Sequence, residues 1–240
     1  MYASLRHYRD HGRLTRQLSY PSRPSPLITA MSFRTVYDRS AGFKIECRET
    51  RGGCGTRWAI YTGTASMNAR LWSNASLMDE DRPLAEVLET AAAATSGISV
   101  LVPSFLGLCS RAGMAHKPDP AWTLGRTKQL NGRACHSIEY ASPDRSFDRY
   151  WIDASTYLLR RVERTMVLDD SQRNAFLACL EAEATALPTD NPHVQFLHEA
   201  VWANAYAGQG LIVGQDTIHI FPDVETPIDS SDLAFALPSS

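Results

Sequence analysis

The sequence predicts an α+β protein built on one large antiparallel sheet of about ten strands, with three or four helices. Three observations carry this prediction. Apolar and polar residues alternate with a period of two over most of the chain, glycine-rich or Asn-Gly turns separate these runs, and a few segments have helical periodicity instead. The chain has 240 residues, of which 44% are hydrophobic and 21% charged. This balance is typical of globular proteins, and the length suits one large domain or two small ones.

The first third of the chain predicts a meander of strands. Short alternating runs joined by tight turns favour antiparallel neighbours, and the turn at residues 52–55 joins two of these runs. The expected strands are residues 12–20, 27–38, 43–48, 57–61 and 67–73.

The period changes at residue 81. Asp81 is placed to cap a helix, Pro83 suits its first turn, and Gly97 is a natural stop. Residues 98–108 follow and are apolar on nearly all sides, so we expect them inside the molecule. Pro103 and Gly107 should divide them into short pieces. That suits a movable lid over a ligand site, with plain core packing as the alternative.

Strands return after residue 121. Asn131-Gly132 lies between two of them and predicts a hairpin, because a type I′ turn needs positive φ at both central residues. Helical periodicity over residues 171–186 and 192–207 indicates a helical insertion at about 171–207. The expected strands are residues 122–130, 133–141, 147–153, 157–168 and 215–221.

The charge balance argues against nucleic acid as a partner. The formal net charge is −2, and a near-neutral chain has no field to hold a polyanion. The longest apolar stretch, residues 98–109, is about half of the ~20 residues that a transmembrane helix needs. The first thirty residues contain no apolar segment of the secretory type.

The cysteines and glycine motifs indicate neither a metal nor a cofactor. The five cysteines include no Cys-x-x-Cys pair, so a zinc knuckle or a redox motif is not expected. Cys47 and Cys54 are close enough to bridge a hairpin, although buried free thiols are the favoured interpretation. The segment 208–214 resembles a dinucleotide fingerprint, but it has one residue too many and leads from a helix into a strand. We expect a return loop there.

Catalysis is not predicted either. The chain has no phosphate-binding Walker loop and no Gly-x-Ser-x-Gly elbow. Cys135 and His136 are neighbours on one strand, so their side chains point to opposite faces and cannot act together. No nucleophile–base pair is apparent, and we do not expect an enzyme.

Four ordered motifs resemble the outer-membrane lipoprotein carrier superfamily of bacteria (LolA/LolB-like). They span roughly residues 8–168 and 215–238. The motifs are Tyr8-Arg-Asp10-His-Gly12; the hairpin Leu130-Asn-Gly-Arg-Ala-Cys-His-Ser-Ile138; Tyr150-Trp-Ile-Asp153 with Leu158-Leu-Arg-Arg-Val162; and Pro227-Ile228 with Leu233-Ala-Phe235.

The resemblance implies a single domain over residues 1–240. It implies that this domain is an open, strongly curved antiparallel half-barrel with helices in or over its concave face. It also implies a non-catalytic carrier or sensor that holds a lipid or a lipoprotein acyl chain, with an envelope protein as a further partner. The expected location is the periplasm or cell envelope, reached by a signal sequence upstream of Met1; a cytoplasmic variant is the alternative. The alternative function is a structural or protein-interaction module of the envelope whose cavity is filled by its own helices.

The expected ligand-binding residues are the large apolar side chains on the two sides of this cavity. From the helical side they are Leu84, Leu88, Val102, Phe105 and Leu106, and from the sheet they are Phe33, Phe43, Trp58 and Trp151.

Overall fold

In the computed structural model, the strands of the described residues form one antiparallel sheet of eleven strands. The structure describes residues 2–21, 23–52, 55–62, 68–74, 81–92, 94–109, 122–141, 146–171 and 211–234, with a few single positions between 174 and 185. The strands are β1 (His7–Ser19), β2 (Leu27–Asp38), β3 (Gly42–Arg51), β4 (Arg57–Thr62), β5 (Asn68–Ser73), β6 (Arg82–Pro83), β7 (Thr123–Leu130), β8 (Arg133–Ala141), β9 (Phe147–Asp153), β10 (Leu159–Leu168) and β11 (Ile212–Asp223). The helices are η1 (Tyr2–Ser4), α1 (Leu84–Thr90), α2 (Ile98–Phe105) and α5 (Ser230–Leu233).

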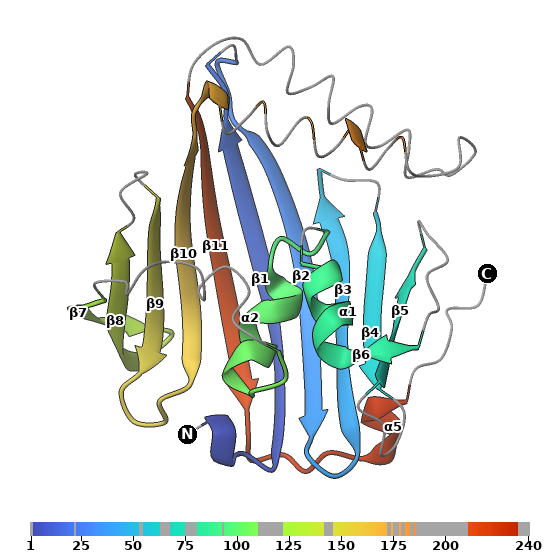
Figure 1. The fold of residues 1–240 in the computed structure, drawn as a ribbon. Coiled ribbons are helices and arrows are strands. Elements are labelled where there is room, and N and C mark those ends of the chain that lie inside the picture. The colour runs from blue at the N-terminus through green and yellow to red at the C-terminus, as the bar shows by residue number, and fades with distance from the viewer. Residues whose placement is uncertain are drawn as a thin grey trace.

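The order of strands across the sheet is β6-β5-β4-β3-β2-β1-β11-β10-β9-β8-β7 (Figure 1). In each half of the chain, strands that follow one another in the sequence pair side by side, and the two runs join where β1 pairs with β11. Within the described residues the edge strands β6 and β7 do not pair, so the sheet is open. This confirms the predicted antiparallel sheet. The Asn131-Gly132 hairpin is also confirmed, with φ of 51° and 77° at these residues.

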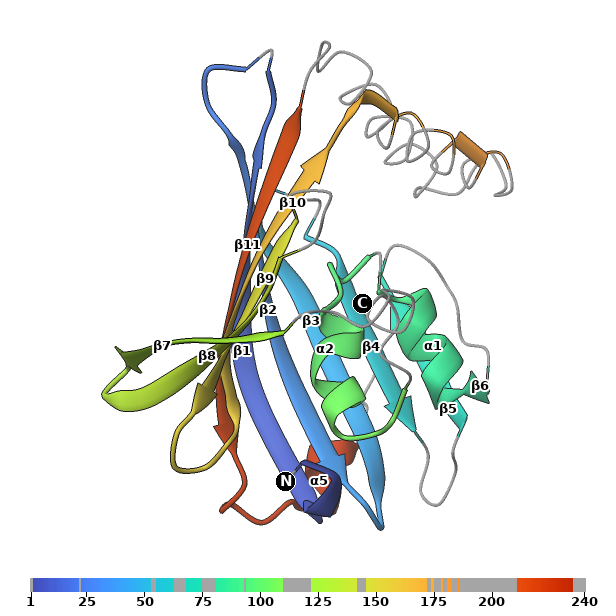
Figure 2. The same ribbon diagram turned by 60° about the vertical axis from the view of Figure 1, so that its left-hand side comes forward.

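Helices α1 and α2 lie against one face of the sheet, which we call the helix-side face; the other is the outer face (Figures 1 and 2). Residues of β1 to β4, β10 and β11 share one apolar core with residues of both helices. Because side chains alternate between the faces of a strand, the pairing register assigns every strand residue to one of them. Leu14 and Ile218, which are partners in β1 and β11, belong to the helix-side face.

The helix boundaries differ from the prediction. Arg82 pairs with Ala69 of β5, so the chain is still extended at Pro83 and α1 begins only at Leu84. Asp81 is therefore not its cap. The helix ends at Thr90, seven residues before Gly97, and Gly97 with φ of 79° instead precedes α2.

Pro103 does not divide the apolar segment; it lies inside α2. Because proline has no N–H donor, Pro103 removes one backbone hydrogen bond from this eight-residue helix, which still extends past it to Phe105. The predicted helices at 171–186 and 192–207, and the glycine loop before residue 211, lie largely outside the described residues. The last strand is longer than expected and already includes Gly214.

Candidate ligand-binding face

The floor of the candidate site is the helix-side face of β2, β3 and β4. Phe33 of β2 pairs with Cys47 of β3, which pairs with Trp58 of β4, so these three residues form one row. Phe43 lies on the same face and is 1% exposed. The structure therefore brings together three of the four sheet residues predicted for the site, namely Phe33, Phe43 and Trp58.

The cover of the floor comes from α1, α2 and the residue that follows α2. Leu84 and Leu88 of α1, and Val102 and Leu106, are buried in the same core as the floor. Phe105 is half-buried at the margin of this core, and its ring centroid lies 5.4 Å from that of Tyr2. All five residues predicted from the helical side thus lie next to the sheet.

Trp151 does not belong to this site, and the prediction that it faces the helices is wrong. Its neighbour Tyr150 pairs with Val162 on the helix-side face, so Trp151, which pairs with Arg161, points to the outer face. There the ring is 1% exposed and has Arg126 and Arg149 over it, at 5.7 and 5.8 Å from its centroid. Arginine stems can cover an aromatic ring as apolar side chains do, so burial alone does not assign a face.

A buried carboxyl group on the helix-side face of β1, beside the floor, was missed by the sequence reasoning. Asp10 is 3% exposed; its Oδ2 accepts a hydrogen bond from the Tyr8 hydroxyl at 2.8 Å and its Oδ1 accepts one from the Thr35 amide at 3.0 Å. Burial raises its pKa to about 6, against these two hydrogen bonds. The sequence did contain a signal for this burial. Asp10 alternates with Tyr8, Gly12 and Leu14, so it shares the inward face of the strand with them.

The helix-side face becomes charged toward the far end of β1. Two residues beyond Leu14, Arg16 forms a two-pronged ion pair with Asp216, with nitrogen–oxygen distances of 2.8 and 2.7 Å. Asp216 in turn is the register partner of Arg164, whose guanidinium reaches Gly97 at the start of α2. The face is therefore apolar under the helices and ionic at one end, which suits a ligand with an apolar chain and a polar end.

We next searched the described part of the chain for metal-binding groups, reactive thiols and membrane-spanning helices. There, no three histidine, cysteine or acidic side chains are grouped so as to hold a metal ion. Cys47 is a free, buried thiol whose pKa is raised by burial, and Cys54 lies outside the described residues. Among the helices that are described, none has the length and apolarity to cross a membrane.

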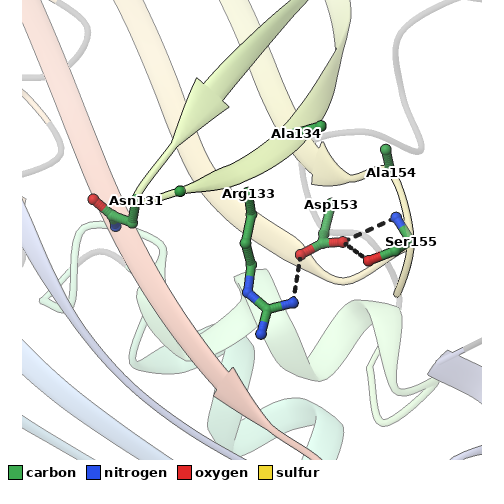
Figure 3. Close-up of a pocket in the computed structure, with 7 residues that line it drawn as sticks. Asn131, Arg133, Ala134, Asp153, Ala154 and Ser155 are labelled. Carbon is green, nitrogen blue, oxygen red and sulfur yellow. Dashed lines mark hydrogen bonds and ion pairs between the residues drawn. The ribbon is translucent and has the colours of Figure 1, made fainter.

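Two cavities lie away from the helices. The larger, of about 510 Å³, is a polar depression between the β7–β8 and β9–β10 turns (Figure 3). In it Asp153 accepts hydrogen bonds from the Ser155 hydroxyl at 2.7 Å and from Arg133 at 3.5 Å. Burial opposes ionisation of Asp153, but hydrogen bonds from Ser155 and Thr156 and the charge of Arg160 outweigh it and hold its pKa well below the usual range. The second cavity, of about 210 Å³, adjoins it along Asn131 and Arg133.

No model of a known protein family matches the sequence, and no curated protein is similar to it. The structure is similar to a DUF1329 family protein from Desulfovibrio piger, with a TM-score of 0.35, 7% identity, and coverage of 97% of this chain and 91% of that one. It is also similar to a domain from Vibrio parahaemolyticus described as an outer membrane lipoprotein-sorting protein, with a TM-score of 0.31, 8% identity, and coverage of 93% and 88%. A LolA superfamily protein from Nitrosomonas europaea gives a TM-score of 0.29, 8% identity, and coverage of 95% and 90%. The last of these belongs to the superfamily that the sequence motifs resemble.

Proposed function

We propose that this protein is a non-catalytic carrier or sensor that binds a lipid or a lipoprotein acyl chain between the sheet and its two covering helices. The observation that supports the proposal is that α1 and α2 together cover the apolar floor of the sheet. The apolar floor of Phe33, Phe43 and Trp58 is shielded by two short helices of seven and eight residues, held to it through side chains. An acyl chain that replaces such a cover gains about 0.8 kcal/mol for each buried methylene group.

The glycines on either side of α2 support the idea that this helix can move relative to the sheet. Gly97 precedes the helix with φ of 79° and Gly107 follows it with φ of 75°. Glycine adopts positive φ at no steric cost and reaches other conformations easily, so both borders can serve as hinges. We propose that α2 moves away from the floor when the ligand enters, and that the ion pairs around Arg16 and Asp216 lie beside the polar end of the ligand.

Dense packing of the same residues favours a second candidate function, a structural or protein-interaction module whose cavity is permanently filled. Leu88 is 0% exposed and Val102 is 2% exposed.

Titration of delipidated protein with a fluorescent fatty acid separates the two functions, because a carrier gives saturable binding and a filled module gives none. Native mass spectrometry of gently purified protein should then show a lipid that copurifies.

Phe105→Asp tests the role of α2. Phe105 is half-buried at the margin of the core, so the variant should stay folded while a charge in the cover abolishes uptake of the fatty acid. Leu124→Asp in β7 is the matched control, since Leu124 is 80% exposed and far from the cover. Global unfolding of the Phe105 variant would mark α2 as fixed core and contradict a movable cover.

The periplasm or cell envelope is the proposed location, and one domain over residues 1–240 the proposed organisation. An in-frame apolar signal segment upstream of Met1 would support the location, and cytosolic fractionation of the natural protein would contradict it.

A further inference from the structure

A row of basic side chains crosses the outer face of the sheet. Arg13 of β1 is the register partner of His219 of β11, which is the partner of Arg161 of β10. Arg13 and Arg161 therefore lie on either side of His219, and their two positive charges are separated by one strand.

The β7–β8 turn closes over one end of this row and leaves the 210 Å³ cavity beneath it. Leu130 and Phe221 supply apolar parts of its wall. Arg133, Arg160, Arg161 and His219 supply the polar part. The cavity thus brings together three guanidinium groups and one imidazole from the three strands β8, β10 and β11.

The cations at the cavity exceed the carboxylates that pair with them. Arg160 and Arg133 share Asp153, at 3.2 and 3.5 Å, and Arg161 pairs with Glu163 at 2.8 Å. Glu163 is itself shared with Arg149, at 2.9 Å. Three cations therefore compete for two carboxylates, one of which also neutralises a fourth cation.

Each of these guanidinium groups also has N–H donors that its ion pair does not use. An arginine has five N–H donors, and the ion pairs use one or two of them in each residue. The Nε atom of Arg161 is buried and has no acceptor among the described residues. A buried donor without an acceptor is unfavourable, and a bound oxyanion would supply the missing acceptor.

We propose that this cavity, which we call the outer-face pocket, binds a phosphate group through Arg133, Arg160 and Arg161. The planar fork of a guanidinium matches the oxygens of a phosphate, and several forks around one small pocket give it orientation as well as charge. Leu130 and Phe221 leave room for an apolar substituent beside the phosphate. This site is separate from the helix-side face and does not rest on the function proposed above.

His219 reports on occupancy of the pocket. Burial first, and then the charge of Arg161, lowers its pKa. A phosphate in the pocket adds negative charge next to the imidazole and so favours its protonated form. The pKa of His219, followed by NMR, should therefore rise when the pocket fills.

The test is a titration of the full chain with inorganic phosphate, read by calorimetry and by the NMR signals of His219. The wild type should bind saturably and show the rise in pKa. Arg133→Gln should weaken binding about tenfold, as expected for the loss of one charged hydrogen bond. Arg133 has a side chain that is 53% exposed, so this variant should keep the wild-type melting temperature.

Arg48→Gln is the matched control, because it removes one exposed arginine from the outer face of β3, three strands away from β11. It should bind phosphate as the wild type does. The proposal is overturned if the wild type shows no saturable binding, or if Arg133→Gln loses no more affinity than Arg48→Gln.

Vesicles identify the source of the phosphate. Phosphatidylcholine vesicles with and without phosphatidic acid are mixed with the protein and sedimented. Sedimentation that needs phosphatidic acid and is reversed by free phosphate assigns a lipid headgroup. Binding of inorganic phosphate without sedimentation assigns a free phosphate or a small phosphate ester, and both outcomes uphold the phosphate site.

Discussion

The ring of Phe33 lies across Gly12, its register partner on β1, so closely that a methyl group on Gly12 would overlap it. The same methyl group would also overlap the backbone carbonyl oxygen of His219 on β11. Gly12 thus leaves room on β1 for an aromatic ring from β2, and the apolar floor extends to this point of β1 for this reason.

Gly12→Ala should therefore lower the free energy of unfolding by roughly 2–3 kcal/mol, the upper range for overpacking a core. The backbone carbonyl cannot move aside as a side chain can, so Gly12→Ala/Phe33→Leu should recover only part of this loss. Urea denaturation measures both variants.

The control is Gly214→Ala in β11, where the nearest atoms are the ends of Met166 and Leu18 at 3.2 and 3.3 Å. These flexible ends can shift, so the loss there should stay below about 1 kcal/mol. Equal losses in the two alanine variants would show that the contact with Phe33 and His219 is not what constrains Gly12.

Asp10→Asn should change how stability depends on pH. The pKa of Asp10 is raised to about 6 in the folded protein, so the folded state binds the proton more tightly than the unfolded state does. The stabilisation is complete below about pH 4 and is lost as the pH rises through 6, by about 3 kcal/mol.

Asparagine cannot ionise, so the stability of Asp10→Asn minus that of the wild type should rise by about this amount between pH 4 and pH 7. Urea denaturation at several pH values measures the difference. Asp38→Asn is the control with the opposite sign, because hydrogen bonds from Ser40 lower the pKa of Asp38. A difference for Asp10→Asn that does not vary with pH would contradict the raised pKa.

Asp153→Ala should lower the free energy of unfolding by about 3–5 kcal/mol, as expected when one member of a buried ion pair is removed. The side chain is 1% exposed and holds the turn after β9 through Ser155 and Thr156, and Arg160 through charge. Thermal and urea denaturation measure the loss. Asp169→Ala, in an exposed position after β10, should cost far less, and an equal cost would refute the special role of Asp153.

Tyr2→Phe isolates the contact between η1 and the sheet. The Tyr2 hydroxyl accepts a hydrogen bond from the Leu159 amide at 2.9 Å, and burial raises the pKa of Tyr2 to about 12. Its loss leaves a buried amide unpaired, so we expect a cost of about 1–3 kcal/mol in urea denaturation. Tyr157→Phe is the exposed control, and a Tyr2 variant as stable as the wild type would contradict this contact.

The sheet could be predicted from the sequence because period-two alternation and turn chemistry are local. Asn131-Gly132 needs only its own two residues to form the predicted turn. The start of α1 could not be predicted in this way, since it depends on Arg82 pairing with Ala69, a residue of another strand.

The sequence predicted the residues of the candidate site correctly where an apolar side chain also falls on the inward side of its strand or helix, as for Phe43 and Leu88. Tyr150 and Trp151 are neighbours on one strand, so only one of them can face the helices, and size alone selected the wrong one. Asp10 is buried because β1 lies between β2 and β11. That placement depends on a partner some two hundred residues later, which no local pattern reveals.

The pairing of β1 with β11 has a consequence during synthesis. While the nascent chain is still emerging, β1 can bond only to β2, and its other edge stays open until the final strand leaves the ribosome. Contacts of such long sequence separation slow folding, and an open strand edge invites pairing with other chains. The join between the two halves therefore cannot form before β11 has been synthesised, and until then this edge of β1 is open to pairing with other chains.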